Sequence, residues 1–196
     1  MLAPSLRFLC YDCATLFCLA LCFALRARMS GEPPIGCLLL ALISALLWPL
    51  ARELVLAGSG LALFSSNGML ISALLGAVLG AFSPMENMRI SYFLERAQGI
   101  CEILGLSLAC CLGLLCALPR LPASGALLAA LLLTVLPQAF ADVTMGDVAS
   151  LLSASARIWR ALLGAIVACA IMLFYPATFF AVFPPDLPLA AGSFCI

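Results

Sequence analysis

The sequence contains no histidine and no lysine, and only 9% of its 196 residues are charged. Cys10 and Cys13 have the C-x-x-C spacing of redox and metal sites, but the chain has no second such pair and no imidazole to complete a zinc shell. The arginines form no basic run, so nucleic acid has no electrostatic footprint to bind. These absences argue against an enzyme, against a metal site or other cofactor, and against a nucleic-acid partner.

What the sequence has instead is apolar residues, which make up 66% of the chain and give a mean hydropathy of +1.25. Both values lie far outside soluble globular usage, and the length allows about six or seven membrane-spanning helices. Most of the 11 cysteines lie inside apolar segments, where cysteine behaves as a small hydrophobic residue. We therefore expect an all-α membrane protein with a single transmembrane domain over residues 1–196.

Apolar runs separated by turn signals predict six helices in this domain. The residues Ser83–Gly99 are the most polar connection between them. Gly76 and Gly80 allow close helix contact, either within the bundle or at an oligomer seam. The tail, 176–196, contains four prolines, so a seventh helix there stays open. The expected helix ranges are Phe8–Leu25, Ile35–Leu56, Met69–Phe82, Ile100–Leu118, Ala123–Ala141 and Ile158–Tyr175.

The second predicted helix ends in an ionisable pair, Arg52 and Glu53, which follows the uncharged run Pro33–Ala51. A helix of that length nearly crosses the hydrocarbon layer, so the pair lies at or near membrane depth. A charge placed there is costly unless it faces protein, a partner or water, which makes the pair a candidate functional site. Pro49, within the same run, is expected to break or kink the helix.

The arginines are unevenly distributed between the two sides of the membrane that these helices imply. Six lie in the connections between the first and second, third and fourth, and fifth and sixth helices. The opposite side has only Arg7 and Arg120. Because positive charge concentrates on the cytoplasmic side, we predict a multi-pass protein whose N-terminus lies outside.

Ionisable residues recur at matched spacings in the two halves of the chain. The separation between Asp12 and Arg52 is the same as that between Glu102 and Asp142. Asp12 and Glu102 each lie early in the first helix of a half, and the other two residues lie at the end of the second helix of each half. The two halves of the chain therefore repeat the same pattern, in which Asp12 corresponds to Glu102.

Each half has three helices, so the second half starts on the opposite side of the membrane and the repeats are inverted. Repeat 1 covers about residues 8–83, and repeat 2 covers about 99–175. In inverted-repeat proteins, binding sites lie near the midplane, where interrupted helices from the two halves meet. Pro49 and Pro137 lie at corresponding places, so we expect the second and fifth helices to be broken there.

These residues resemble a known family, the bacterial relatives of the trimeric intracellular cation channels, also catalogued as a glycine-transporter domain. Its members carry an acidic residue early in each half and a T-A-x-G-G-G-x-x-R-D-like motif that breaks the next helix. The resemblance covers about residues 8–175, and after one deletion Asp142–Val148 aligns with a D-V-L-L-G-x-I run. The other matching residues are Asp12, Ala20, Ala27, Gly31, Gly36, Ser44, Ala45, Arg52 and Glu53, then Glu102, Gly105, Leu106, Gly113, Ala117 and Thr134.

The sequence departs from this family inside the motif itself. Leu47-Trp48-Pro49 and Pro137-Gln138-Ala139 stand where the family has its glycine triplets. Ala141 replaces the second arginine, and Glu53 replaces the first aspartate. Glycines let backbones approach closely and open carbonyl oxygens to an ion path, whereas leucine and tryptophan fill that space. The resemblance is therefore to a divergent member.

The resemblance implies a channel for monovalent cations such as potassium, with a pore in each protomer of a homotrimer in the bacterial inner membrane. A glycine-type transporter and a non-conducting member remain alternatives. The implied partners are monovalent cations and membrane lipids. Arg52 either gates the path or neutralises a carboxylate inside the bundle. The pore and gating candidates are Pro49, Arg52, Glu53, Pro137, Gln138 and Asp142, and the buried charge partners are Asp12 and Glu102.

Overall fold

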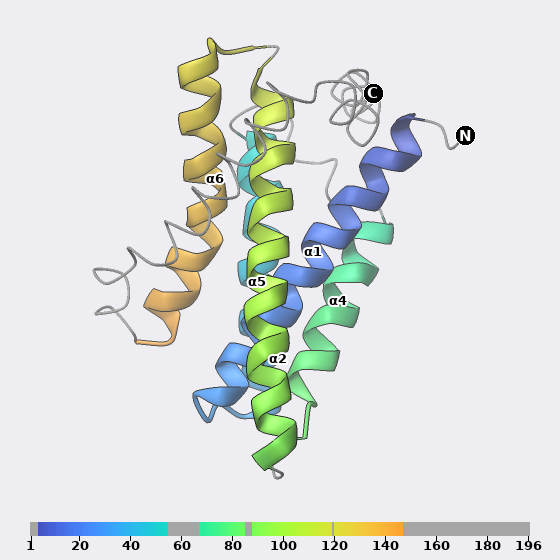
Figure 1. Ribbon diagram of the computed structural model, residues 1–196, viewed down its shortest axis with the longest axis vertical. Helices are drawn as coiled ribbons and strands as arrows, with labels where there is room; N and C mark the ends of the chain where they lie inside the picture. Colours follow the sequence, from blue (N-terminus) through green and yellow to red (C-terminus); the bar gives the residue numbers. More distant parts are fainter. Residues whose placement is uncertain (1–3, 55–66, 85–87, 119, 147–196) are drawn as a thin grey trace.

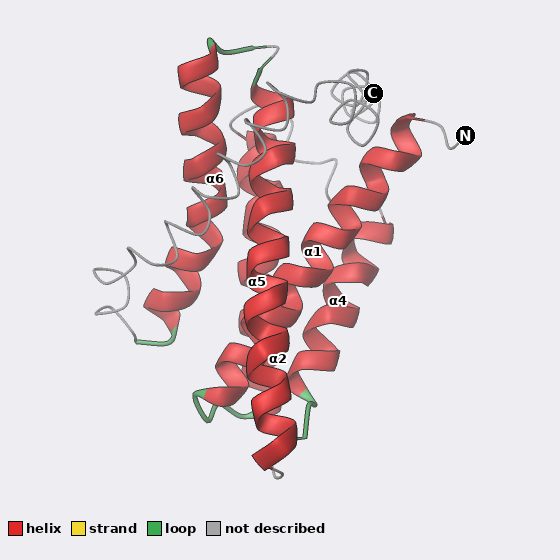
Figure 2. Cartoon of the chain, in the orientation of Figure 1, coloured by secondary structure: helices red, strands yellow, loops and turns green. Residues whose placement is uncertain are grey.

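The computed structural model describes residues 4–54, 67–84, 88–118 and 120–146, which form helices and short turns with no strand among them. Figures 1 and 2 show these helices running side by side as a bundle. The prediction of an all-α architecture is confirmed for this part of the chain. The helices are α1 (Pro4–Met29), α2 (Pro34–Arg52), α4 (Asn67–Ala81), α5 (Met88–Ala117) and α6 (Ala123–Thr144).

Four of these helices are long and apolar enough to cross a membrane. Their apolar spans are Leu9–Met29, Pro34–Arg52, Ile90–Ala117 and Ser124–Thr144. At a rise of about 1.5 Å per residue, α2 extends about 28 Å, close to the thickness of the hydrocarbon layer. The fifth helix, α4, is apolar but has only 15 residues. The chain is a multi-pass membrane protein.

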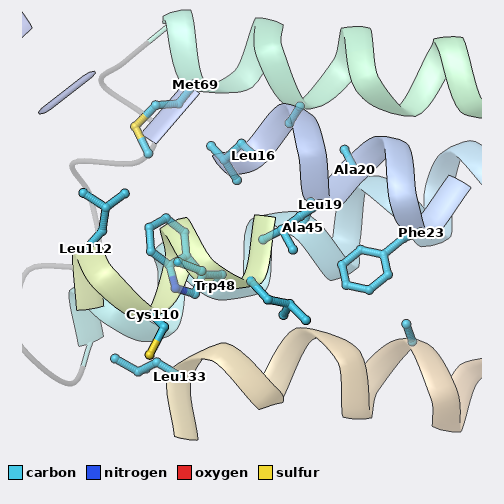
Figure 3. Packing of buried hydrophobic residues seen from close by; sticks show 14 of the residues in the cluster. Leu16, Leu19, Ala20, Phe23, Ala45, Trp48, Met69, Cys110, Leu112 and Leu133 are labelled. Atoms are coloured by element: carbon cyan, nitrogen blue, oxygen red, sulfur yellow. The ribbon is translucent and has the colours of Figure 1, made fainter. Parts of the chain in front are cut away.

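Helix α1 lies at the centre of the bundle. It contacts α2, α4 and α5, while α6 packs against α5 and α2 (Figure 1). Leu16, Leu19 and Phe23 are spaced three and four residues apart, so they share one face of α1, and all three are buried. Figure 3 shows these side chains in the same apolar cluster as Trp48 of α2 and Leu112 of α5.

Small residues bring α4 close to α1. A Cβ atom built on Gly76 would lie 2.5 Å from the carbonyl oxygen of Phe17, and one built on Gly80 would lie 2.5 Å from the Cβ of Ala24. Side chains do not approach each other that closely, so both positions require glycine. The glycine pair therefore serves close packing within the chain, one of the two roles that the sequence leaves open.

The turn between α1 and α2 is short and makes the two helices antiparallel neighbours. Gly31 has a φ of +87°, a conformation that residues with a side chain rarely adopt. The N–H of Glu32 donates to the carbonyl oxygen of Ala27 at 3.1 Å and satisfies one of the last carbonyls of α1. Pro34 then opens α2, where its missing N–H costs no helical hydrogen bond.

The breaks expected at Pro49 and Pro137 do not occur at these prolines, although the α-helical geometry of α2 ends at Arg52 and changes to a π turn at Glu53 and Leu54. α2 continues through Pro49 to Arg52, and α6 continues through Pro137 to Thr144. Each proline removes one backbone donor, but the hydrogen bonds on either side persist, and packed neighbours stabilise a local bend in a membrane helix. Figure 1 shows α6 changing direction in its orange C-terminal part. Both proline side chains are buried.

The polar segment Ser83–Gly99 is also different from expectation, because it is helical from Met88 onward and forms the start of α5. Tyr92, Glu95 and Arg96 are exposed there, and the guanidinium of Arg96 stacks over the ring of Tyr92 at 4.8 Å. Such pairs four residues apart support a helix. The predicted connection fails because a local concentration of charge does not by itself end a helix.

Two further expectations concern the ends of helices and the end of the chain. α1 and α6 extend past their predicted C-terminal limits, to Met29 and Thr144. The predicted helix Ile158–Tyr175 and the tail, 176–196, lie outside the described residues. The number of helices beyond these five therefore stays a prediction.

Candidate functional site

A buried ion pair joins α1 and α2. The guanidinium of Arg52 donates two hydrogen bonds to the carboxylate of Asp12, from Nη1 to Oδ1 at 2.6 Å and from Nη2 to Oδ2 at 3.0 Å. Arg52 is 5% exposed and Asp12 is 2% exposed. A two-pronged contact between planar groups is the strongest common form of charge-assisted hydrogen bond. Among the carboxylates that could neutralise Arg52, Asp12 makes this contact.

The sequence itself accounts for this meeting. Asp12 on α1 and Arg52 on α2 lie at nearly equal distances along the chain from the turn that joins the two helices. Two antiparallel helices joined by a short turn return to the same level after equal lengths, since every residue of a helix adds the same rise. The two charges therefore lie opposite each other at one end of the bundle.

Trp48 lies one helical turn before Arg52 and is fully buried. The guanidinium carbon of Arg52 lies 4.7 Å from the centroid of the indole ring, a cation–π contact. The indole N–H finds no hydrogen-bond partner among the described residues. Trp48 thus fills the buried space beside Arg52 with an aromatic ring, and it also supports the cation of the ion pair.

Glu53 brings a second carboxylate to Arg52. Its Oε1 lies 3.9 Å from Nη2 of Arg52, which is close enough for attraction but too long for a hydrogen bond. Its Oε2 is buried and has no hydrogen-bond partner within the described part of the chain. The whole residue is 8% exposed. Asp12, Trp48, Arg52 and Glu53 form what we call the Arg52 cluster.

A second polar contact joins α5 and α6. The side-chain amide of Gln138 donates to Oε1 of Glu102 at 3.1 Å, and both residues are 5% exposed. Gln138 is the uncharged polar residue that the sequence placed near the end of the fifth helix. It makes a structural hydrogen bond with one of the two acidic residues that open the predicted repeats.

Asp142, one turn after Gln138 on α6, forms a salt bridge with Arg26 near the end of α1. Asp142 is 2% exposed, and only 13% of the Arg26 side chain is exposed. The sequence analysis missed Arg26, because it assigned this residue to the loop after the first helix. The longer α1 brings Arg26 inside the bundle. Arg26, Glu102, Gln138 and Asp142 form what we call the Asp142 cluster.

The candidate residues thus separate into two clusters at different levels of the bundle. Asp12 and Arg26 mark the two levels on α1, and they lie about four helical turns apart, which is about 21 Å along the helix. Arg52 accordingly does not share a site with Glu102 or Asp142. Pro49 lies in the last turn of α2 beside the Arg52 cluster, and Pro137 precedes Gln138 in the Asp142 cluster.

Buried hydroxyl groups lie on the same helices between these clusters. Thr15 donates to the carbonyl oxygen of Tyr11 at 2.8 Å, and Thr134 donates to that of Ala130 at 2.7 Å. These contacts satisfy the threonine donors within their own helices. The hydroxyl of Ser44 is buried without a hydrogen-bond partner among the described residues. Sequence reasoning singled out none of these hydroxyls for chemistry, because small polar residues in apolar helices are common.

Comparisons with known proteins do not identify the chain. No family model, no curated protein and no solved structure matches it. Within residues 4–54, 67–84, 88–118 and 120–146, no group of three or more metal-ligating side chains is placed to hold a metal ion. The candidate site is therefore defined by its own geometry, which consists of two buried charge clusters within a membrane bundle.

Proposed function

We propose that this protein is a membrane channel for monovalent cations such as potassium. The observation that carries the proposal is the sign of the buried charge in the described helices. Acidic side chains outnumber basic ones there, so the bundle interior attracts cations and repels anions, as rings of carboxylates do in cation channels. The buried ionisable side chains are the acidic Asp12, Glu53, Glu102 and Asp142 and the basic Arg52, whereas Arg26 and Arg28 are partly exposed.

The contacts between helices support the proposed inverted repeats. At the spacing that relates Asp12 to Glu102, Arg26 corresponds to Cys116 and Arg52 corresponds to Asp142. Arg26 pairs with Asp142, and Cys116 lies close enough to Arg52 for an electrostatic interaction. A contact between α1 and α6 thus has a counterpart between α5 and α2. Pseudo-twofold symmetry of this kind is the architecture in which transport paths lie between two halves.

Three companion proposals follow, the first two from the resemblance to the cation-channel family and the third from the distribution of the arginines. The protein forms a homotrimer, lies in a bacterial inner membrane, and has its N-terminus outside. The homotrimer has its own test, since crosslinking that saturates at dimer rejects it. A non-conducting member is the second candidate function, and Trp48 favours it, because a fully buried indole fills the space that the family keeps open with glycine.

Flux through liposomes tests the channel directly. Purified protein should carry potassium down its gradient. It should not carry chloride, and the flux should not require a transported substrate such as glycine. Glu102→Gln removes one buried negative charge while keeping a side chain that can accept the hydrogen bond from Gln138. It should lower potassium flux several-fold. Glu95→Gln is the matched control, because Glu95 is an exposed residue on the same helix.

Two outcomes decide against the channel, and a third decides against its proposed basis. Saturable glycine uptake assigns a carrier instead. Potassium flux equal to that of protein-free liposomes, with no glycine uptake, assigns the non-conducting member. If the Glu102→Gln and Glu95→Gln proteins show equal potassium flux, both above background, then buried negative charge is not the basis of cation passage.

A further inference from the structure

The Arg52 cluster has the composition of a cation site that is already occupied by a side chain. Nη2 of Arg52 lies 3.0 Å from Oδ2 of Asp12 and 3.9 Å from Oε1 of Glu53. One positively charged nitrogen atom therefore bridges two carboxylates that come from different helices. Any small cation that replaced this nitrogen would meet the same two oxygen atoms.

Within the described residues, the cluster's own side chains do not balance in charge. Two carboxylates face one guanidinium, so the three ionisable side chains carry a formal charge of minus one. Oε2 of Glu53 is buried and unpartnered among the described residues, and burying a carboxylate oxygen without a partner is costly. A cation bound beside Glu53 would remove that cost.

The indole ring of Trp48, the remaining side chain of the cluster, is also suited to a cation. The guanidinium lies over the face of Trp48, whose electron-rich ring attracts ligand cations as well as side-chain ones. Trp48 is fully buried, so water does not weaken this attraction.

We propose that Asp12 and Glu53 form a binding site for a monovalent metal cation and that Arg52 is its built-in competitor. In the observed state the guanidinium occupies the site. A cation that enters takes the place of Nη2 between the carboxylates, and Arg52 moves away from Asp12. The site rests on the proposed cation conduction and adds to it the residues that bind the ion and the residue that blocks them.

Two neutralising variants test the site in detergent, without any need for flux. Arg52→Gln removes the competitor and leaves Asp12 and Glu53 in place. Its melting temperature should rise saturably with potassium or sodium chloride relative to N-methylglucamine chloride of equal ionic strength, because a ligand that binds the folded state stabilises it. The double variant Asp12→Asn/Arg52→Gln removes one carboxylate as well, and its melting temperature should not depend on the cation.

Fluorescence provides a second readout on the unaltered cluster. The chain has two tryptophans, so Trp159→Phe leaves Trp48 as the single reporter beneath the guanidinium. Displacement of Arg52 by potassium or sodium should change its emission saturably, and N-methylglucamine should not. If Arg52→Gln does not fold in any salt, this measurement decides alone. A cation effect in Arg52→Gln without one in the single-tryptophan parent still supports the site, because it shows that Arg52 outcompetes the ion.

The site is overturned if neither protein responds selectively to potassium or sodium, or if the double variant responds as strongly as Arg52→Gln. Its failure is distinguishable from failure of the channel. If the protein binds the cation in detergent but passes none in liposomes, the binding site is supported and the proposed channel is rejected. If the protein conducts but neither the melting temperature nor the fluorescence changes with the cation, the channel is supported and the binding site is rejected.

Discussion

Removing one partner of the Asp12–Arg52 pair should destabilise the bundle severely. Arg52→Ala deletes both hydrogen bonds of 2.6 and 3.0 Å and leaves Asp12, 2% exposed, without its counter-charge. Breaking a buried pair in this way typically costs roughly 3–5 kcal/mol, and the lost stacking on Trp48 adds about 1–2 kcal/mol. Chains of this length lose roughly 2–4 °C of melting temperature per kcal/mol, so the expected drop is at least about 8 °C.

A double-mutant cycle separates the pair from the packing around it. Asp12→Asn and Arg52→Gln each preserve side-chain volume and should each be destabilising, whereas the double variant should lose much less than the sum of the two. The difference is the coupling energy, which for residues in direct contact reaches about 0.5–3 kcal/mol. Melting in detergent, with N-methylglucamine as the cation throughout, gives all four values without any contribution from a bound metal ion.

Two results would refute this account of the pair. Single variants within about 0.5 kcal/mol of the parent would mean that Arg52 reaches the interface and water, as long basic side chains do at helix ends. Losses that add with no coupling would mean that the pair does not form in the detergent-solubilised protein. Exposed pairs behave in that way, since they typically contribute less than about 1 kcal/mol.

The remaining predictions concern packing and orientation. Gly80→Ala should lower the melting temperature by several degrees, since its Cβ would lie 2.5 Å from that of Ala24, whereas Gly99→Ala, with open space around it, should have no such effect. Cys18 of α1 and Cys101 of α5 lie close enough for an electrostatic interaction, so mild oxidation should crosslink them within one chain, and loss of the crosslink in Cys18→Ser is the control. In a cysteine-depleted background, single cysteines in the loop 29–31 should react only from inside the cell; labelling from outside contradicts the proposed orientation.

The position of Arg52 at membrane depth could be predicted from sequence, because it follows from the local hydrophobic pattern. An unbroken apolar run places Arg52 near membrane depth, and burial there demands a counter-charge. What the sequence left open was whether Arg52 gates a path or pairs inside the bundle, and which carboxylate would pair with it. The choice depends on the position of the turn at Gly31, which sets Asp12 and Arg52 at nearly equal distances from the connection between their helices.

The failed predictions share a different cause, which is tertiary packing that overrides local signals. Pro49 and Pro137 lie inside continuous helices because neighbouring helices cover the turns that they weaken. The start of α5 is helical although it is rich in charge, because Glu95 and Arg96 are exposed and keep their charges in a polar environment. Arg26 was assigned to a loop, because one extra turn of α1 cannot be read from composition alone.

The two clusters also differ in a way that the proposed repeats explain. Under the proposed correspondence, Arg52 of the first repeat matches Asp142 of the second, while Asp12 and Glu102 are both acidic. The first repeat can therefore pair its own two charges, and Arg52 binds Asp12.

The second repeat cannot do the same, because Glu102 and Asp142 repel each other. Glu102 instead accepts a hydrogen bond from neutral Gln138, one turn before Asp142. Asp142 pairs with Arg26, which belongs to the other half. The reversal of one charge between the repeats thus accounts for a salt bridge that links α1 to α6 and for the excess of buried acidity on which the proposed cation path depends.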